Sequence, residues 1–81
     1  MNNSKWVSQI ESDYKFAKEQ GFDSINLIIE SSGGEYEIYE TEHGFRSDTI
    51  DGVYDDIDEI AEVLCGAIQL NGDTILDLRI E

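Results

Sequence analysis

The sequence predicts a small α+β domain in which two helices pack on one face of an antiparallel-based sheet. Two segments repeat apolar residues at three- and four-residue spacing, as amphipathic helices do, and others alternate apolar and polar residues, as strands do. Turn-forming residues separate these segments. At 81 residues the chain has the length of one domain, so we assign residues 1–81 to a single domain. The expected element order is α-β-β-(β)-α-β, where the parentheses mark a short third strand.

The first element is a helix from Ser4 to Gln20. Ser4 is a favourable N-cap residue, and Gly21 is a favourable residue just past the last turn. One face of this helix is apolar, formed by Val7, Ile10, Tyr14 and Ala17.

Two strands follow at Ser24–Glu30 and Glu35–Thr41, joined by a four-residue loop over 31–34. Such a loop pairs Glu30 with Glu35 and continues the register to Asn26 opposite Tyr39. The alternation then survives on both strands, which favours this register. One face carries Ile25, Leu27, Ile29, Tyr36 and Ile38. The other carries Asn26, Ile28, Glu30, Glu35, Glu37 and Tyr39, and we expect it to stay open to solvent or to a partner.

After a turn over 41–44, the sequence predicts a short strand at Phe45–Asp48 and a second helix from Asp55 to Leu70. The last strand, Thr74–Ile80, should point Leu76, Leu78 and Ile80 inward and Asp77 and Arg79 outward. The crossover through the second helix predicts that this strand lies beside the first one and parallel to it.

Acidic residues dominate the charge: 19 aspartates and glutamates against five lysines and arginines give a net charge of −14. Residues 30–62 contain twelve acidic residues and a single basic residue, Arg46, so this segment has a net charge of −11. Such a field repels nucleic acids and anionic membranes and attracts basic protein surfaces. We therefore expect no direct nucleic-acid binding, no membrane association, and a basic protein as the partner.

Several of the acids lie where repulsion between like charges should destabilise the local structure. Glu30 faces Glu35 across the hairpin, and like charges directly opposed are unfavourable. Asp55 and Glu59 form a like pair at four-residue spacing in the second helix. A purely solvated surface is the alternative, and the helix dipole does favour acids in the first turn. We predict instead that a partner-binding surface comprises Glu30, Glu35, Glu37, Tyr39, Glu40, Glu42, Asp48, Asp51, Asp55, Asp56, Asp58, Glu59 and Glu62.

The sequence contains no constellation of catalytic or metal-binding residues. The single histidine, His43, falls in a predicted turn, and the single cysteine, Cys65, falls near the apolar face of the second helix. A calcium loop starting at Asp48 would place its glycine fifth, whereas the loop requires it sixth. We therefore expect neither enzymatic activity nor a metal or other cofactor. A lone cysteine and the absence of an apolar leader predict a cytoplasmic protein.

Carboxylates along a strand can imitate the phosphates of DNA. Duplex DNA carries a charge about every 3.4 Å along each strand. Residues of a β-strand rise by about the same distance. A basic groove that holds DNA would therefore accept such a surface.

The central hairpin resembles that of the small acidic anti-CRISPR proteins of phages, in particular the Cas9 inhibitors of listerial prophages. The resemblance rests on DSINLII at 23–29 and on GEY at 34–36 with Ile38. This chain ends in a helix and a strand, where the family ends in helices. The resemblance implies a DNA-mimicking phage protein that inhibits a CRISPR effector in the cytoplasm of the bacterial host. Glu35, Glu40, Glu42 and the acids of 48–62 would then face the effector's DNA-binding groove.

Two further classes remain open at this point. An immunity protein or antitoxin that neutralises a basic nuclease toxin needs the same size and acidity. A structural protein could self-associate through the open sheet face, using Ile28, Tyr39 and Ile75, although the charge of −14 opposes this. We expect a monomer or a small homo-oligomer.

Overall fold

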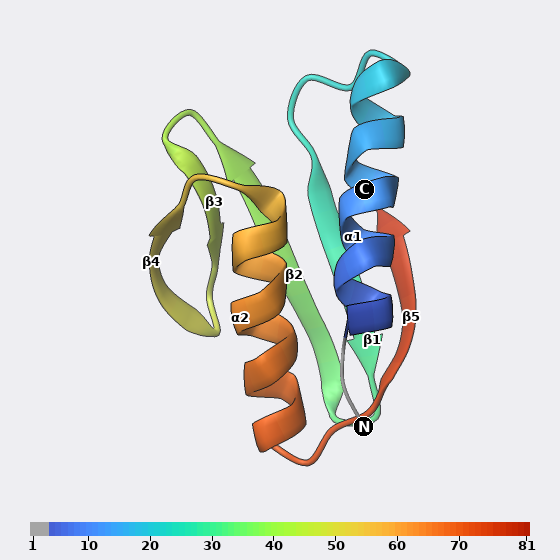
Figure 1. Ribbon diagram of the computed structural model, residues 1–81, viewed down its shortest axis with the longest axis vertical. Helices are drawn as coiled ribbons and strands as arrows, with labels where there is room; N and C mark the ends of the chain where they lie inside the picture. Colours follow the sequence, from blue (N-terminus) through green and yellow to red (C-terminus); the bar gives the residue numbers. More distant parts are fainter. Residues whose placement is uncertain (1–3) are drawn as a thin grey trace.

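The fold consists of two helices lying side by side on one face of a five-stranded antiparallel sheet (Figure 1). The computed structural model describes residues 4–81. The predicted α+β class, with both helices on one face, is confirmed. The predicted capping role of the Ser4 side chain lies outside what is described. The elements are α1 (Ser4–Glu19), β1 (Asn26–Ser31), β2 (Gly34–Thr41), β3 (Gly44–Ser47), β4 (Ile50–Tyr54), α2 (Ile57–Leu70) and β5 (Ile75–Ile80).

The β1–β2 hairpin has the predicted register, from Asn26 opposite Tyr39 to Glu30 opposite Glu35. One further pair, Ser31 opposite Gly34, shortens the loop to two residues. The Ser31 hydroxyl holds this turn, because it donates to the Gly34 carbonyl oxygen at 2.8 Å and accepts the Gly33 N–H at 3.2 Å.

The β2–β3 turn uses the same arrangement. Thr41 Oγ1 donates to the Gly44 carbonyl oxygen at 2.7 Å and accepts the His43 N–H at 3.2 Å. Gly44 has a φ of +134°, and a Cβ atom here would collide with the Tyr54 carbonyl oxygen of β4. Glycine therefore allows both the turn and the close approach of β4.

A fourth strand, β4, was not predicted. It pairs with β3 through Phe45 opposite Tyr54 and Ser47 opposite Ile50, with an irregularity between these pairs. Gly52, at φ +92°, lies in the irregular stretch and breaks the two-residue alternation that would mark a strand. Because β4 adds one reversal of the chain, α2 and β5 run opposite to their expected directions. β5 does lie beside β1, but antiparallel to it, so the predicted parallel pairing is wrong.

The final strand also differs in which residues it buries. A register shift opposite Glu30 and Ser31 places Ile75 in the core at 8% exposed and leaves Leu76 59% exposed. The predicted inward position of Leu76 is therefore wrong, while Leu78 and Ile80 pack against the core as expected.

The core lies between the sheet and the two helices and includes Ile10, Leu27, Ile29, Ile38, Ile60, Leu64 and Ile68. On the opposite face Ile28 is 5% exposed, so neither Ile28 nor Ile75 is available for the self-association considered above. No helix in the described part of the chain is both long and apolar enough to cross a membrane.

Candidate acidic interaction surface

The open face of the sheet carries a row of carboxylates across three strands. Glu30 of β1 lies directly opposite Glu35 of β2 on one side and Asp77 of β5 on the other. The predicted like-charge contact between Glu30 and Glu35 is thus present. Arg79 partly offsets it, because its Nη2 lies 3.0 Å from Glu35 Oε2. Asp77 and Arg79 were predicted to point outward, but only the β1–β5 register places them in this row.

Tyr39 and Asp48 come together at the β3 side of the same face. The Tyr39 hydroxyl donates to Asp48 Oδ2 at 3.0 Å, and Arg46 Nη2 lies 3.6 Å from Asp48 Oδ1. The hydrogen bond to Asp48 raises the pKa of Tyr39, and the nearby charges of Asp48 and Glu37 add to this effect. Tyr39 therefore remains a protonated hydrogen-bond donor at neutral pH.

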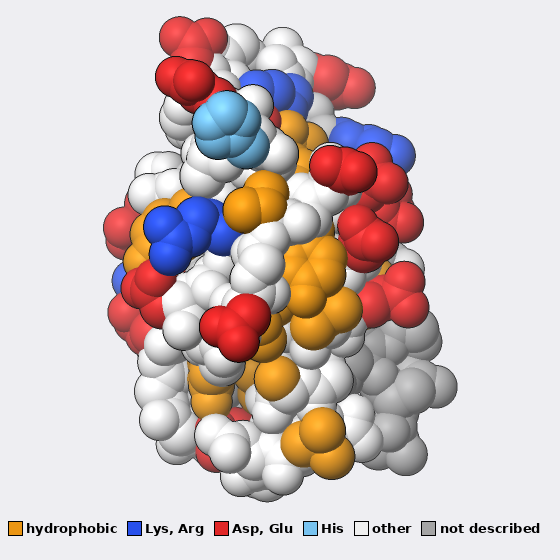
Figure 2. All heavy atoms as spheres, turned by 90° about the vertical axis from the view of Figure 1, so that its left-hand side faces the viewer, with side chains coloured by type: hydrophobic (Ala, Val, Ile, Leu, Met, Phe, Trp, Pro, Cys, Tyr) orange, Lys and Arg blue, Asp and Glu red, His pale blue; other side chains and the backbone are white. Residues whose placement is uncertain are grey.

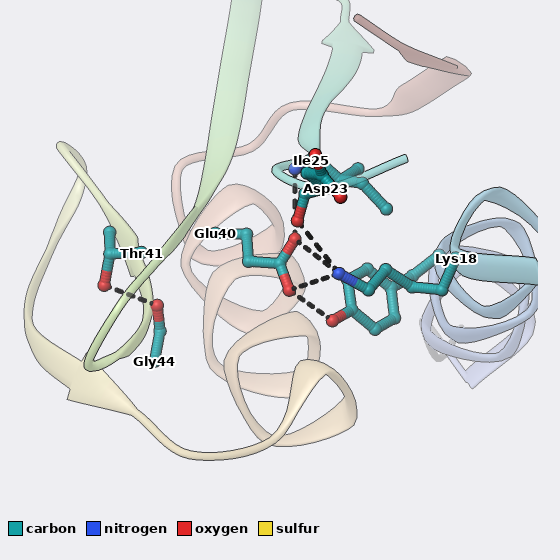
Figure 3. Close-up of polar contacts among 7 residues, drawn as sticks. Lys18, Asp23, Ile25, Glu40, Thr41 and Gly44 are labelled. Carbon is teal, nitrogen blue, oxygen red and sulfur yellow. Dashed lines mark hydrogen bonds and ion pairs between the residues drawn. The ribbon is translucent and has the colours of Figure 1, made fainter. Parts of the chain in front are cut away.

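Glu40 does not belong to this open face. It shares the helix-facing side of β2 with Ile38, and its side chain is 17% exposed. Figure 3 shows its carboxylate at the centre of a polar cluster. Tyr14 donates to Oε2 at 2.6 Å, the Ile25 N–H donates to Oε1 at 3.1 Å, and Lys18 Nζ lies 3.2 Å from Oε2. The structure thus gives Glu40 an internal role that joins α1, the residue before β1, and β2, rather than a free position on the predicted surface.

The environment of Tyr14 supports this role for Glu40. Burial raises the pKa of Tyr14 to about 12, and the hydrogen bond to Glu40 contributes next. Tyr14 is therefore protonated at any physiological pH and holds its donor position against the carboxylate.

The other large group of acids surrounds the start of α2. Asp56 occupies the N-cap position, so the helix begins two residues after the predicted Asp55, yet its side chain makes no capping hydrogen bond. Asp55, Asp56 and Asp58 line a groove of about 360 Å³ between α1, β3 and α2. The remaining lining residues are Glu11, Tyr14, Lys15, Phe45 and Ile57.

The predicted acids therefore form two surfaces instead of one continuous band. We call Glu30, Glu35, Glu37 and Asp77 the sheet-face acids, and Asp55, Asp56, Asp58, Glu59 and Glu62 the helix-end acids. The sheet separates the two groups, because α2 packs on the face opposite the sheet-face acids. Figure 2 shows acidic side chains toward both margins of the face that includes β4, with hydrophobic surface and some acidic and basic side chains between them. Glu42 lies in the β2–β3 turn, and Asp51 lies in β4.

Few of these acids are neutralised within the molecule. Across residues 4–81, ion pairs reach only Glu35, Glu40 and Asp48 among the predicted site residues. In that part of the chain the other nine acids form no ion pair: Glu30, Glu37, Glu42, Asp51, Asp55, Asp56, Asp58, Glu59 and Glu62. All five helix-end acids are exposed, so their charge is directed to solvent or to a partner.

His43 and Cys65 lie in different environments. His43 is exposed in the β2–β3 turn, whereas Cys65 is fully buried in α2. Burial raises the pKa of the Cys65 thiol to about 11, which keeps it protonated and weakly nucleophilic. Within residues 4–81, no group of three or more histidine, cysteine or acidic side chains is arranged to hold a metal ion.

In comparisons with known proteins, the chain matches no protein-family model, no curated protein and no solved structure. The two acidic surfaces and their geometry are therefore the basis for any functional argument.

Proposed function

We propose that this protein is a non-enzymatic inhibitor that binds the basic nucleic-acid-binding surface of a partner protein. The observation that carries this proposal is the cluster of helix-end acids. Five exposed carboxylates lie within eight residues, at and just before the start of α2, and no base in the described chain forms an ion pair with them. Repulsion at i, i+4 spacing makes such a cluster unfavourable for the helix itself.

The groove beside these acids supports the proposal chemically. Asp55, Asp56 and Asp58 border it on one side, and Phe45 and Ile57 form part of its lining. An arginine combines a planar guanidinium that binds carboxylates in bidentate fashion with an aliphatic stem that packs on apolar surface. A basic side chain of a partner would therefore find both kinds of contact here.

The sheet-face acids offer a second contact with phosphate-like spacing. Neighbouring strands lie about 4.8 Å apart, so the row from Asp77 through Glu30 to Glu35 places three carboxylates at regular intervals. Negative charges recur about every 3.4 Å along each strand of duplex DNA, so this row offers a basic groove a similar density of negative charge. The resemblance of the hairpin to anti-CRISPR proteins favours a CRISPR effector as the partner. A nuclease toxin would be recognised by the same chemistry.

Capture of the partner from a bacterial host lysate tests the proposal. The full chain is immobilised, alongside an Asp55→Asn, Asp56→Asn, Asp58→Asn variant as the matched bait. At about 0.1 M salt, where screening acts over about 10 Å, we expect the wild-type bait to retain a basic nucleic-acid-binding protein that the variant loses. The captured protein should elute as salt is raised toward about 1 M. Equal capture by both baits, or retention that is independent of salt, would count against the proposal. The identity of the captured protein separates a CRISPR effector from a toxin.

A further inference from the structure

Strand β5 forms an edge of the sheet with a free row of backbone groups. Over residues 4–81 it pairs with β1 alone. Asn26 and Glu81 exchange both backbone hydrogen bonds, at 3.3 and 2.9 Å. Hydrogen-bonded and non-hydrogen-bonded pairs alternate along an antiparallel ladder. Arg79 and Asp77 therefore direct their backbone groups toward β1, whereas Leu78 and Ile80 direct theirs away from the sheet.

The two edges of the sheet differ in how well they could accept another strand. At the β4 edge, the irregularity between the Phe45 and Ser47 pairs interrupts the ladder. Such bulges protect an edge from pairing with another chain. At the β5 edge, the register with β1 shifts between Ile75 and Asp77 but is regular over the four residues from Asp77 to Ile80, whereas the β4 edge has no regular stretch of that length. The β5 edge is thus the one available for strand addition.

The side chains of β5 make this edge complementary to itself. An antiparallel pair of two β5 strands, centred on Leu78, places Leu78 opposite Leu78 and Asp77 opposite Arg79 of the second copy. Shifting the centre to Asp77 or to Arg79 would place like charges directly opposite each other. Arg79 already forms ion pairs with Glu35 and Glu81 of its own copy. Because opposed unlike charges stabilise and opposed like charges destabilise cross-strand pairs, charge favours the Leu78-centred register over those centred on Asp77 and Arg79.

The directions of the backbone N–H and C=O groups of β5 also favour the Leu78-centred register. Leu78 would form a hydrogen-bonded pair with its copy, as its outward N–H and C=O require. Asp77 and Arg79 would then fall in non-hydrogen-bonded pairs, where side chains approach more closely. We propose that the protein forms a two-fold symmetric dimer through antiparallel β5–β5 pairing centred on Leu78. The inference is independent of the proposed function.

Exposed apolar side chains near the β5 edge also favour a second copy of this chain as the binding partner. Phe16, Phe22 and Ile80 line an apolar groove of about 230 Å³, and Phe16 and Phe22 are 62% and 48% exposed. In the proposed register, β5 of the second copy runs beside Ile80, at the edge of this groove. Leu76 is itself 59% exposed in the monomer. Dimerisation would therefore bring the second copy next to exposed apolar side chains of α1 and of the segment that follows it.

The interface is small, and each copy carries a charge of −14, so we expect a weak dimer. Screening over about 8 Å at physiological ionic strength limits the repulsion between distant acids. Sedimentation equilibrium of the full chain in such salt should give a dissociation constant between about 1 µM and 1 mM.

A charge swap tests the register. In the proposed dimer, residue 77 of each copy lies opposite residue 79 of the other, so every substitution acts on two pairs. Asp77→Arg places an arginine opposite Arg79 in each pair. Arg79→Asp places an aspartate opposite Asp77 in each pair. Each single variant should weaken dimerisation by about tenfold or more, and the double variant should restore it. Asp77→Arg changes the net charge from −14 to −12, so repulsion by total charge predicts stronger association for this variant. It should also relieve the contact with Glu30, so its thermal midpoint at low concentration should not fall.

Three results would overturn the inference. The first is a wild-type protein that remains fully monomeric at about 1 mM, where even the weakest dissociation constant expected would leave about half of the chains in dimers. The second is an Asp77→Arg variant that dimerises as well as the wild type. The third is a double variant that is folded by circular dichroism but does not regain the dimer.

Discussion

Replacing Asp55, Asp58 and Glu59 with their amides is expected to weaken partner binding by about tenfold or more, with little change in stability. Charges at the rim of an interface mainly affect the association rate, and each contributes a fraction of a kcal/mol to the binding free energy. Removal of three such charges together should therefore lower the affinity by about tenfold. Stability should stay within about 1 kcal/mol, because loss of the favourable helix-dipole interaction is balanced by relief of repulsion between Asp58 and Glu62, which lie four residues apart in α2. Partner affinity and thermal midpoint are the measurements.

A second triple variant, Glu30→Gln, Glu35→Gln and Glu37→Gln, tests the sheet-face acids in the same assay. The matched control replaces Asp13, Glu19 and Asp23 with amides, because these acids lie away from both surfaces and remove the same charge. Glu11 is left intact in the control because it lines the groove. If the control loses as much affinity as the helix-end variant, total charge governs binding and the local surface has no special role.

Glu40→Ala is expected to lower the free energy of unfolding by about 2–3 kcal/mol. The substitution leaves the Ile25 N–H and the Tyr14 hydroxyl without their acceptor, and unsatisfied donors in partly buried positions carry a penalty of this size. For a domain of this length the thermal midpoint should fall by roughly 10–20 °C. Thermal unfolding followed by circular dichroism measures the effect.

Glu37→Ala is the matched control for this result. Glu37 lies on the same strand three residues earlier, but on the open face, and its loss should change stability by no more than about 0.5 kcal/mol. Glu40→Gln should fall between the two, because the amide oxygen can still accept a hydrogen bond. Equal effects of Glu40→Ala and Glu37→Ala would show that the polar cluster around Glu40 does not stabilise the fold.

The sequence predicts the hairpin well because its two strands constrain each other. The observed register keeps Leu27, Ile29 and Ile38 on a common face, and a slip by one residue would move Ile38 to the other face. The same alternation predicts that the Glu40 side chain faces the helices, because Glu40 follows the buried Ile38 by two residues. Charge alone assigned it to the surface, and only its contacts with Tyr14 and Ile25 reveal the internal role.

The direction of β5 could not be predicted without β4. Gly52 and the irregular pairing around it remove the periodic pattern from that strand. One missed strand reverses every element that follows, and with it the pairing of β1 and β5. The division of the acids into two surfaces was also beyond the sequence, since residues 30–62 are continuous in the chain but lie on both sides of the sheet.

Competition with duplex DNA for the captured partner tests the proposed function most directly. Labelled duplex is bound to the partner, and unlabelled protein is added at constant salt while fluorescence anisotropy is followed. The wild-type chain should displace the duplex completely, and the variant with amides at Asp55, Asp58 and Glu59 should require about tenfold more protein, in line with its loss of rim charges. A ternary complex, in which the partner retains its DNA at saturating concentrations of the protein, would contradict binding at the nucleic-acid surface.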